Sequence, residues 1–328
     1  MRVNELDPKS AAPWTILVGN LAIRFDLGAN PTFDRRTKRF LAPAPLTDVD
    51  PNHTVSIEAG TAPAPKRPSN AIDDMGAEIE LSAASLWLRH GGHVIAGDSS
   101  STRIYLDAAS EQCDPYLFIM AFFNRLSLHE GWVPLHSALL QCDQGATMLF
   151  GPSGRGKSTT SGAALHAGWA VASDDITFLR SMPCGGIEAL GLPRALSIPD
   201  EAIPLSLRGQ ASDSTDHRDR RVIGNFDRCD SWQTVVGSLV VDHGLSPETT
   251  VQELKKLEFV QALVRCEAFA ARGSDEQARS LEVVEGLTAL PAGRLMLGRE
   301  PSTRIETAAK CLQESIERFA DRLESVPV

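Results

Sequence analysis

The chain has 328 residues, of which 42% are hydrophobic and 23% are charged, and its formal net charge at pH 7 is −10. This composition is typical of a globular protein and excludes a wholly disordered chain, and the length allows one large core or two modest ones. The negative charge argues against extensive nonspecific binding to nucleic acid, because such binding depends on Lys and Arg neutralising phosphates.

Membrane insertion and secretion are not expected. The longest apolar run, residues 117–123, is far shorter than the roughly 20 residues that a membrane-spanning helix needs. The amino-terminal sequence MRVNELDPKS lacks the apolar stretch of a secretory signal, so we expect a cytoplasmic protein. The cysteines show no Cys-x-x-Cys pair and no clustered His partners, which argues against a zinc site or a disulfide framework.

Residues 1–112 are rich in β-strand patterns. Alternating and β-branched residues predict strands within residues 14–27, 54–60, 77–90 and 101–107. Residues 114–131 then predict a buried helix, with Asp114 as its N-cap and Pro115 at its first position. We therefore place a boundary between an amino-terminal β-rich region, residues 1–112, and a second domain, residues 113–328.

The second domain contains further apolar strands and two amphipathic helices. Strands are predicted within residues 136–141, 145–150 and 234–244. Helices are predicted at residues 251–271 and 303–326 from apolar residues at helical spacing. The polar segment between the predicted strands, residues 208–231, has the composition of a mobile loop.

A glycine-rich sequence, GPSGRGKS, lies between a predicted strand and a predicted helix. Gly151, Gly156, Lys157 and Ser158 satisfy the Walker A pattern G-x-x-x-x-G-K-[ST] of a phosphate-binding loop, or P-loop. Backbone N–H groups and the helix amino terminus surround phosphate oxygens in such a loop, and its lysine reaches the β and γ phosphates. We therefore expect a site for ATP or another nucleoside triphosphate, with Ser158 binding Mg²⁺; a plain glycine turn is the alternative. The expected nucleotide-binding residues are Gly151, Pro152, Ser153, Gly154, Arg155, Gly156, Lys157, Ser158 and Thr159.

Two aspartates, Asp174 and Asp175, end the short apolar segment WAVASDD that follows this helix. An ordinary right-handed crossover would place that segment beside the strand that precedes the loop, with both carboxylates facing the phosphates. One carboxylate can hold Mg²⁺ and the other can accept a proton from an attacking hydroxyl, which suits phosphoryl transfer to an alcohol. In the alternative, Asp174 caps a turn and only Asp175 binds metal.

The order of three segments, LHSALLQ, GPSGRGKS and SDD, resembles the catalytic core of the HPr kinase/phosphorylase family. The resemblance covers residues 135–176. More loosely, LGLPRALSIP is similar to a segment of shorter HPr-kinase-related proteins, including peptide-tailoring kinases of lasso-peptide clusters. The resemblance to the HPr kinase/phosphorylase family implies a phosphoenolpyruvate-carboxykinase-like α/β fold. It also implies that Asp174 is the catalytic base, Asp175 a metal ligand and His136 the active-site histidine. Without the resemblance, a single histidine beside an apolar strand is more often a core residue.

Two regions depart from the family. No further acidic metal ligand is recognisable after the aspartates, although Asp200 and Glu201 are candidates, and residues 1–112 do not resemble the family's regulatory domain. Both departures argue against a phosphocarrier protein as acceptor.

Arginines are concentrated in the segment HRDRRVIGNFDR, although the chain as a whole is acidic. Because the planar guanidinium suits bidentate recognition of phosphate or carboxylate, these arginines are candidates for binding nucleotide phosphates or an acidic acceptor. A solvated loop with internal Arg–Asp pairs is the alternative. The candidates are Arg194, in GLPRALSIP, and Arg218, Arg220, Arg221 and Arg228.

Together these features predict an ATP- and Mg²⁺-dependent kinase in which Lys157 holds the phosphates. The expected acceptor is a serine-type hydroxyl on a peptide or small protein, such as a lasso-peptide precursor. Three alternatives stay open: a kinase for free serine or another small alcohol, a non-catalytic nucleotide-binding regulator, and a plain ATPase.

Overall fold

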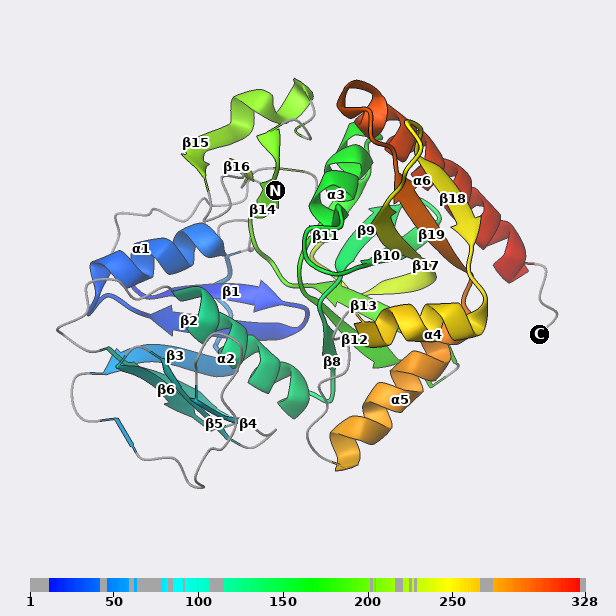
Figure 1. Cartoon of the computed structure of the whole chain (residues 1–328). Coiled ribbons are helices and arrows are strands. Elements are labelled where there is room, and N and C mark those ends of the chain that lie inside the picture. The colour runs from blue at the N-terminus through cyan, green and yellow to red at the C-terminus, as the bar shows by residue number, and fades with distance from the viewer. Residues whose placement is uncertain are drawn as a thin grey trace. The chain divides into compact units, whose positions relative to one another are not determined.

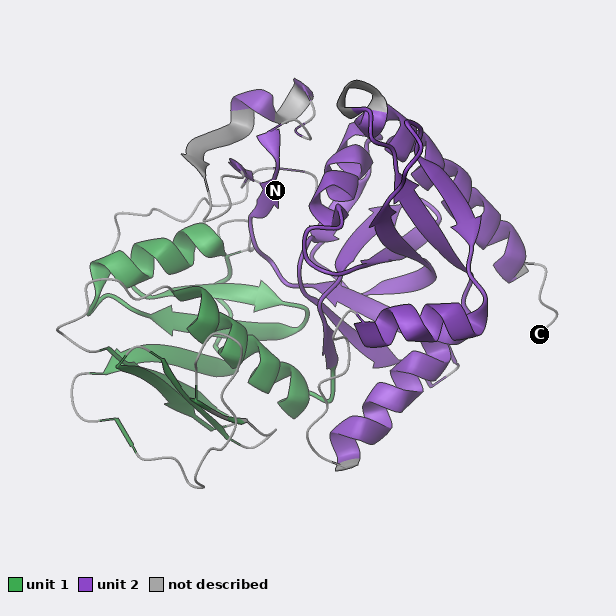
Figure 2. Ribbon diagram, in the orientation of Figure 1, with its two compact units in different colours: residues 1–132 green, residues 133–328 purple. Residues whose placement is uncertain are grey.

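The fold is that of a computed structural model of the chain (Figure 1). The described residues form six α-helices and several mixed β-sheets, which confirms the expected α/β class. The chain divides into two compact units, Met1–Trp132 and Val133–Val328 (Figure 2). Within the described part, no helix is long and apolar enough to cross a membrane. The structure describes residues 12–41, 46–58, 62–63, 78–81, 85–90, 92–98, 100–106, 115–183, 185–200, 203, 205–215, 221–223, 226, 229–265 and 274–324.

Unit 1 is built on a seven-stranded sheet in the order β1-β2-β3-β7-β6-β5-β4. The pairs β2–β3 and β3–β7 are parallel, and the other neighbours are antiparallel. The β-strands predicted in this region are confirmed. The elements of unit 1 are β1 (Trp14–Val18), β2 (Leu21–Asp26), α1 (Pro31–Phe40), β3 (His53–Glu58), β4 (Glu78–Leu81), β5 (Leu86–His90), β6 (His93–Gly97), β7 (Ser101–Tyr105) and α2 (Pro115–His129).

Helix α1 was not predicted, because its charged sequence hides its amphipathic pattern. Asn30 caps it by accepting a hydrogen bond from the Phe33 N–H at 3.0 Å, and Pro31 occupies the first turn. Inside the helix, Asp34 and Lys38 form a buried ion pair at 2.8 Å. A buried pair of this kind allows the polar helix to pack against the sheet, since neither charge is left uncompensated.

The predicted helix α2 is confirmed, but it lies in unit 1 rather than at the start of the second domain. Its apolar residues pack against α1 and β5 of the first unit. The boundary therefore falls between Trp132 and Val133 and not between residues 112 and 113. The predicted N-cap, Asp114, lies outside the described residues.

Unit 2 is built on a nine-stranded sheet whose main path is β11-β9-β10-β17-β13-β12-β8, with β19 pairing β17 and β18. A smaller sheet has the order β14-β16-β15. The elements of unit 2 are β8 (Val133–Leu135), β9 (Ala138–Cys142), β10 (Gly145–Phe150), α3 (Lys157–His166), β11 (Ala170–Ser173), β12 (Thr177–Ser181), β13 (Ile187–Gly191), β14 (Leu196–Ile198), the 3₁₀ helix η2 (Leu205–Gln210), β15 (Ala211–Thr215), β16 (Arg221–Ile223), β17 (Gln233–His243), β18 (Thr250–Glu253), α4 (Lys256–Arg265), α5 (Ser274–Ala289), β19 (Ala292–Leu297) and α6 (Pro301–Glu324).

Helices cover both faces of the large sheet (Figure 1). Helices α3 and α6 pack on one face, where Ala163, Leu239 and Ile316 share a buried cluster. Helices α4 and α5 cover the other face, where Phe259 and Leu287 belong to a second cluster. This double cover explains why β10 and β17 are apolar along nearly their whole length.

The expectation that the aspartate-bearing strand lies beside the strand before the P-loop is wrong. β11 pairs antiparallel with β9, and β9 pairs antiparallel with β10. The tight turn that ends at Gly145 folds β9 against β10, so the crossover through α3 must pass over β9. β10 and β11 are therefore parallel but two places apart, and the strand that pairs parallel with β10 is β17.

Two further predictions on unit 2 need correction. The helix expected at residues 251–271 is replaced at its start by β18, whose residues pair with β19, and α4 begins only at Lys256. The segment 208–231 was expected to be a mobile loop, but its described parts include η2, β15 and β16. β16 pairs with β14, because alternating residues from Leu196 onward provide a partner strand. The helix predicted at residues 303–326 is confirmed as α6.

Candidate active site

The glycine-rich loop connects β10 to α3, as the sequence predicts. Gly156 has φ 103° and stands at the N-cap of α3, where it offers no side chain to cap the first N–H groups. A Cβ atom at Gly156 would lie 2.2 Å from Leu297 Cδ1, and one at Gly151 would lie 2.7 Å from the Val241 carbonyl oxygen. Conformation and space therefore both demand glycine, and the uncapped helix amino terminus fits a phosphate group.

Lys157, the first residue of α3, is buried, and its ammonium group is turned into the loop. Its Nζ donates a hydrogen bond to the Gly151 carbonyl at 2.7 Å and lies 3.0 Å from His136 Nε2. The ammonium group thus contacts the first residue of the loop, and the lysine of a Walker A pattern is the residue that reaches the phosphates.

His136 lies in the short connection between β8 and β9 and contacts the site through both ring nitrogens. Nε2 faces Lys157, and Nδ1 lies 3.0 Å from Asp175 Oδ1. Because an ammonium group can only donate, Nε2 accepts, and in the neutral ring the proton is on Nδ1, where it points to Asp175. His136 therefore joins the lysine of the loop to a carboxylate that follows β11.

Asp175 is shared between two hydrogen-bond donors, His136 and Arg194. One oxygen contacts His136, and the other forms a hydrogen-bonded ion pair with Arg194 Nη1. Burial raises the pKa of Asp175, but the charge of Arg194, the hydrogen bond from His136 and the charge of Lys157 outweigh it and hold that pKa well below the ordinary value of 3.8. Asp175 is therefore a carboxylate over the whole neutral range.

Asp174 is more deeply buried than Asp175, with side-chain exposures of 3% and 17% respectively. Asp174 Oδ2 accepts a hydrogen bond from the Ser197 N–H at 3.3 Å, and Oδ1 lies 3.8 Å from Arg194 Nε. Ser197 belongs to β14, so the segment that follows Arg194 fixes the orientation of this carboxylate. Arg194 contacts both aspartates through one guanidinium group.

Five of the predicted residues thus form one continuous set of contacts, which we call the carboxylate cluster. One member comes from the β8–β9 connection, one from the start of α3, two directly follow β11, and the fifth precedes β14. All lie within unit 2. The carboxylate cluster consists of His136, Lys157, Asp174, Asp175 and Arg194.

Other predicted residues lie elsewhere. Arg221 pairs with Asp200, a candidate metal ligand, at 2.7 Å from Nε to Oδ1. Arg155 pairs with Asp242 at 3.1 Å. The exposed part of the loop includes Pro152, Ser153, Gly154 and Arg155, whereas Ser158 and Thr159 are half-buried in the first turn of α3. Outside the described residues are Arg218, Arg220, Arg228 and Glu201.

The sequence interpretation missed Asp242, the penultimate residue of β17. β17 runs parallel to β10 and directly beside it, so Asp242 stands next to the glycine-rich loop and binds Arg155. The signal was available in the sequence, since an acidic residue directly follows the apolar run Leu239–Val240–Val241. That pattern is typical of a buried strand that ends at a phosphate site.

A preformed metal cage is absent from the part of the chain that the structure describes. No group of three or more His, Cys, Asp and Glu side chains there is placed to hold an ion. Mg²⁺ is usually bound by one or two protein ligands together with waters and substrate phosphates. Ser158 and Asp175 would be those ligands.

A scan of the chain against protein-family models finds no match, and a search of the curated proteins finds none either.

Proposed function

We propose that unit 2 is an ATP- and Mg²⁺-dependent kinase with a phosphoenolpyruvate-carboxykinase-like core, and that it phosphorylates a serine-type hydroxyl of a peptide or small protein. One observation carries the proposal. The lysine of the glycine-rich loop contacts His136, and His136 contacts Asp175, which shares Arg194 with Asp174. A binding loop alone would not need two carboxylates that are linked to its lysine through an imidazole and an arginine.

The depressed pKa of Asp175 bears on the role of that carboxylate. A carboxylate whose proton affinity is strongly lowered is a poor general base, because proton transfer to it has little driving force. Such a group is well suited to bind a cation. We therefore assign Asp175 to Mg²⁺, together with Ser158, and Asp174 to the acceptor hydroxyl, as the family resemblance implies.

Arg194 and Lys157 supply positive charge on the two sides of Asp175. Positive groups fixed around a transferring phosphoryl group stabilise the charge on its oxygens. In the structure Arg194 is bound to the carboxylates, so a phosphoryl group that enters the site competes with the aspartates for its guanidinium. We propose that Arg194 bridges the carboxylates and the γ-phosphate during transfer.

The proposed reaction forms one bond and breaks one. The acceptor oxygen bonds to the γ-phosphorus, and the bond from that phosphorus to the oxygen bridging it to the β-phosphate breaks. Asp174 takes the hydroxyl proton, and the nucleoside diphosphate leaves with the electron pair of the broken bond. Mg²⁺, when bound, neutralises phosphate charge.

The variant Asp174→Asn tests this assignment. Asparagine keeps an oxygen that can accept the Ser197 N–H bond, but it cannot take a proton, so we expect phosphate transfer to fall by about 10² to 10⁴-fold while ATP binding persists. The measurement is transfer of ³²P from labelled ATP to a serine-containing peptide library and to free serine. Asp143→Asn, in the exposed turn between β9 and β10, is the matched control and should transfer at the wild-type rate.

The same assay separates the alternatives. Undiminished transfer by Asp174→Asn removes the proposed base. Hydrolysis of ATP that no acceptor stimulates would indicate an ATPase, and tight ATP binding without turnover would indicate a regulator. Transfer to free serine in preference to the peptides would identify a small-molecule kinase.

A further inference from the structure

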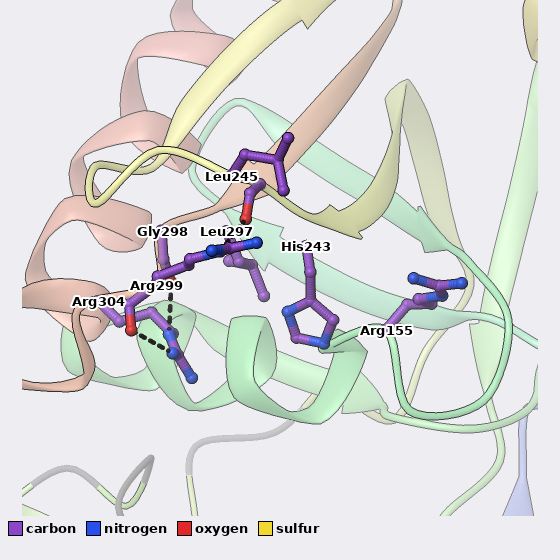
Figure 3. A pocket seen from close by; sticks show the side chains of 8 residues that line it. Arg155, His243, Leu245, Leu297, Gly298, Arg299 and Arg304 are labelled. Atoms are coloured by element: carbon purple, nitrogen blue, oxygen red, sulfur yellow. Dashed lines mark hydrogen bonds between the residues drawn. The ribbon is translucent and has the colours of Figure 1, made fainter.

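A pocket of about 590 Å³ opens beside the glycine-rich loop, on the side away from β9 and β11 (Figure 3). Its walls come from the segment after β17, the connection from β19 to α6, the first turn of α6, and Arg155 of the loop itself. We call it the arginine pocket, because Arg155, Arg299 and Arg304 line it together with His243. The carboxylate cluster contributes no residue to it.

The arginine pocket and the glycine-rich loop share a wall. The His243 ring hydrogen-bonds the Gly154 carbonyl, with Nε2 at 3.1 Å from the oxygen. Leu297 lines the pocket, and its Cδ1 is 2.2 Å from the position that a Cβ of Gly156 would take. A molecule whose phosphates lie in the loop can therefore extend directly into the pocket.

The pocket arginines are held by backbone carbonyls. Arg304 donates from Nε to the Gly298 carbonyl at 2.7 Å and from Nη2 to the Arg299 carbonyl at 3.0 Å (Figure 3). Arg299 Nε lies 3.4 Å from the Gly244 carbonyl oxygen. These bonds fix the planes of the guanidinium groups, and a fixed guanidinium plane can stack on an aromatic ring.

The remaining lining is suited to a planar, partly apolar ligand. Leu245 is 81% exposed at the pocket, although a large aliphatic side chain gains by being covered. Because the Gly154 carbonyl can only accept, His243 Nε2 carries a proton, and in the neutral ring Nδ1 is an acceptor facing the arginines (Figure 3). The pocket thus offers stacking surfaces, an acceptor and guanidinium donors. A small inorganic anion would use only the last of these.

We propose that the arginine pocket binds the base and ribose of the nucleoside triphosphate whose phosphates occupy the glycine-rich loop. The proposal rests on the proposed function, since it needs a nucleotide in that loop. It makes the protein selective for a nucleotide over inorganic polyphosphate, with the base stacked between Leu245 and an arginine plane.

Isothermal titration of the full chain with Mg·ATP and with inorganic tripolyphosphate tests the proposal. Wild type should bind ATP at least about tenfold more tightly, because only ATP reaches the stacking groups. The double variant Leu245→Ser, Arg299→Ala should lose most of that preference while its affinity for tripolyphosphate stays within about twofold. Leu281→Ser, an exposed leucine on α5, is the control and should behave as wild type.

The outcomes distinguish this inference from the proposed function. Equal affinity of wild type for the two ligands overturns the arginine pocket as a nucleoside site and leaves the phosphate loop intact. The inference is also overturned if two tripolyphosphate ions bind per chain. It is overturned as well if the double variant loses affinity for ATP and for tripolyphosphate to the same extent. If neither ligand binds wild type, both the proposed function and this inference fail. Single Leu245→Ser repeats the test with an exposed side chain whose loss the fold tolerates.

Discussion

The carboxylate cluster and the arginine pocket, on the two sides of the glycine-rich loop, differ in how their charged side chains are paired. In the carboxylate cluster, Arg194 and Asp174 are almost fully buried, and each charge contacts an opposite charge or a hydrogen-bond donor. In the arginine pocket, Arg299 and Arg304 are held by backbone carbonyls, and the pocket is open. In the carboxylate cluster the positive and negative side chains neutralise one another. In the arginine pocket the arginines present positive charge to a ligand that enters the pocket.

This difference follows from strand order. β11 lies beyond β9, so the aspartates that follow it are enclosed by β14 and by Arg194. β17 and β19 are the successive parallel strands on the other side of β10, and the open pocket is formed where they end and by the segments after them. Buried charges require partners, because an unpaired one costs several kcal/mol. We therefore assign chemistry to the enclosed side and recognition to the open side.

Removal of Lys157, the carboxylate-cluster residue that begins α3, should have a large effect on phosphate transfer. Lys157→Met should reduce phosphate transfer by about 10² to 10³-fold, because a buried positive group that faces the phosphates is lost. Transfer assays and titration with ATP measure the effect, and Lys255→Met, an exposed lysine before α4, is the control. Wild-type affinity and turnover in Lys157→Met would show that the loop does not hold the nucleotide.

Removal of the Arg194 ion pairs from the carboxylate cluster should lower the stability of the fold. Arg194→Gln leaves the buried Asp174 and Asp175 without their shared cation, so we expect the free energy of unfolding at pH 7 to fall by about 3 kcal/mol. Arg180→Gln breaks the more exposed pair with Glu188 in the same unit and should cost about 1 kcal/mol. Denaturant titration measures both, and equal losses would contradict the enclosed character of the carboxylate cluster.

The loss in Arg194→Gln should depend on pH. The pKa of Asp175 is depressed in the folded protein, so the stability it contributes is fully present above its ordinary pKa of 3.8 and is lost as the pH falls below that value toward the depressed pKa. The difference in Tm between wild type and Arg194→Gln should therefore be larger at pH 7 than at pH 3. A difference that stays constant with pH would show that Asp175 is not the group stabilised by Arg194.

Two glycines of the loop offer a matched comparison on the pocket side. Gly154→Ala places a Cβ in open space and should cost only the positive-φ strain of about 1 kcal/mol. Gly156→Ala adds a collision with Leu297, so we expect about 2 kcal/mol and weaker ATP binding. Equal effects of the two variants, measured by thermal unfolding and titration, would mean that Leu297 moves freely and that the shared wall is not rigid.

The smallest effect is expected at Asp242. Its pair with Arg155 is about half exposed, so Asp242→Asn should change the free energy of unfolding by less than about 0.5 kcal/mol. The Mg²⁺ concentration that supports half-maximal transfer should also stay unchanged, because Asp175 is the proposed ligand. A marked rise in that concentration would assign the metal to the β17 side instead.

The sequence by itself determined the local features of unit 2. The order of residue types predicted β10, the glycine-rich loop and α3, because glycine at positive φ and a strand–loop–helix context are local properties. The resemblance to the HPr kinase/phosphorylase family added His136 to the site of Asp174 and Asp175, and the structure brings their side chains together with Lys157. The terminal helix α6 followed from its apolar periodicity, and the apolar helix α2 followed from Pro115 at its first position and Gly131 after its end.

Tertiary structure decided what depends on partners distant in the sequence. The crossover from β10 passes over β9 because the β9–β10 hairpin occupies the place beside β10, and no local pattern records the pairing of β11 with β9. Residues 250–253 form a strand rather than a helix because β19 offers hydrogen bonds to them. The arginine pocket also depends on tertiary structure. Arg155 lies more than 100 residues before Arg299 and Arg304 in the sequence, and these residues line one pocket only because β17 and β19 join the sheet beside β10.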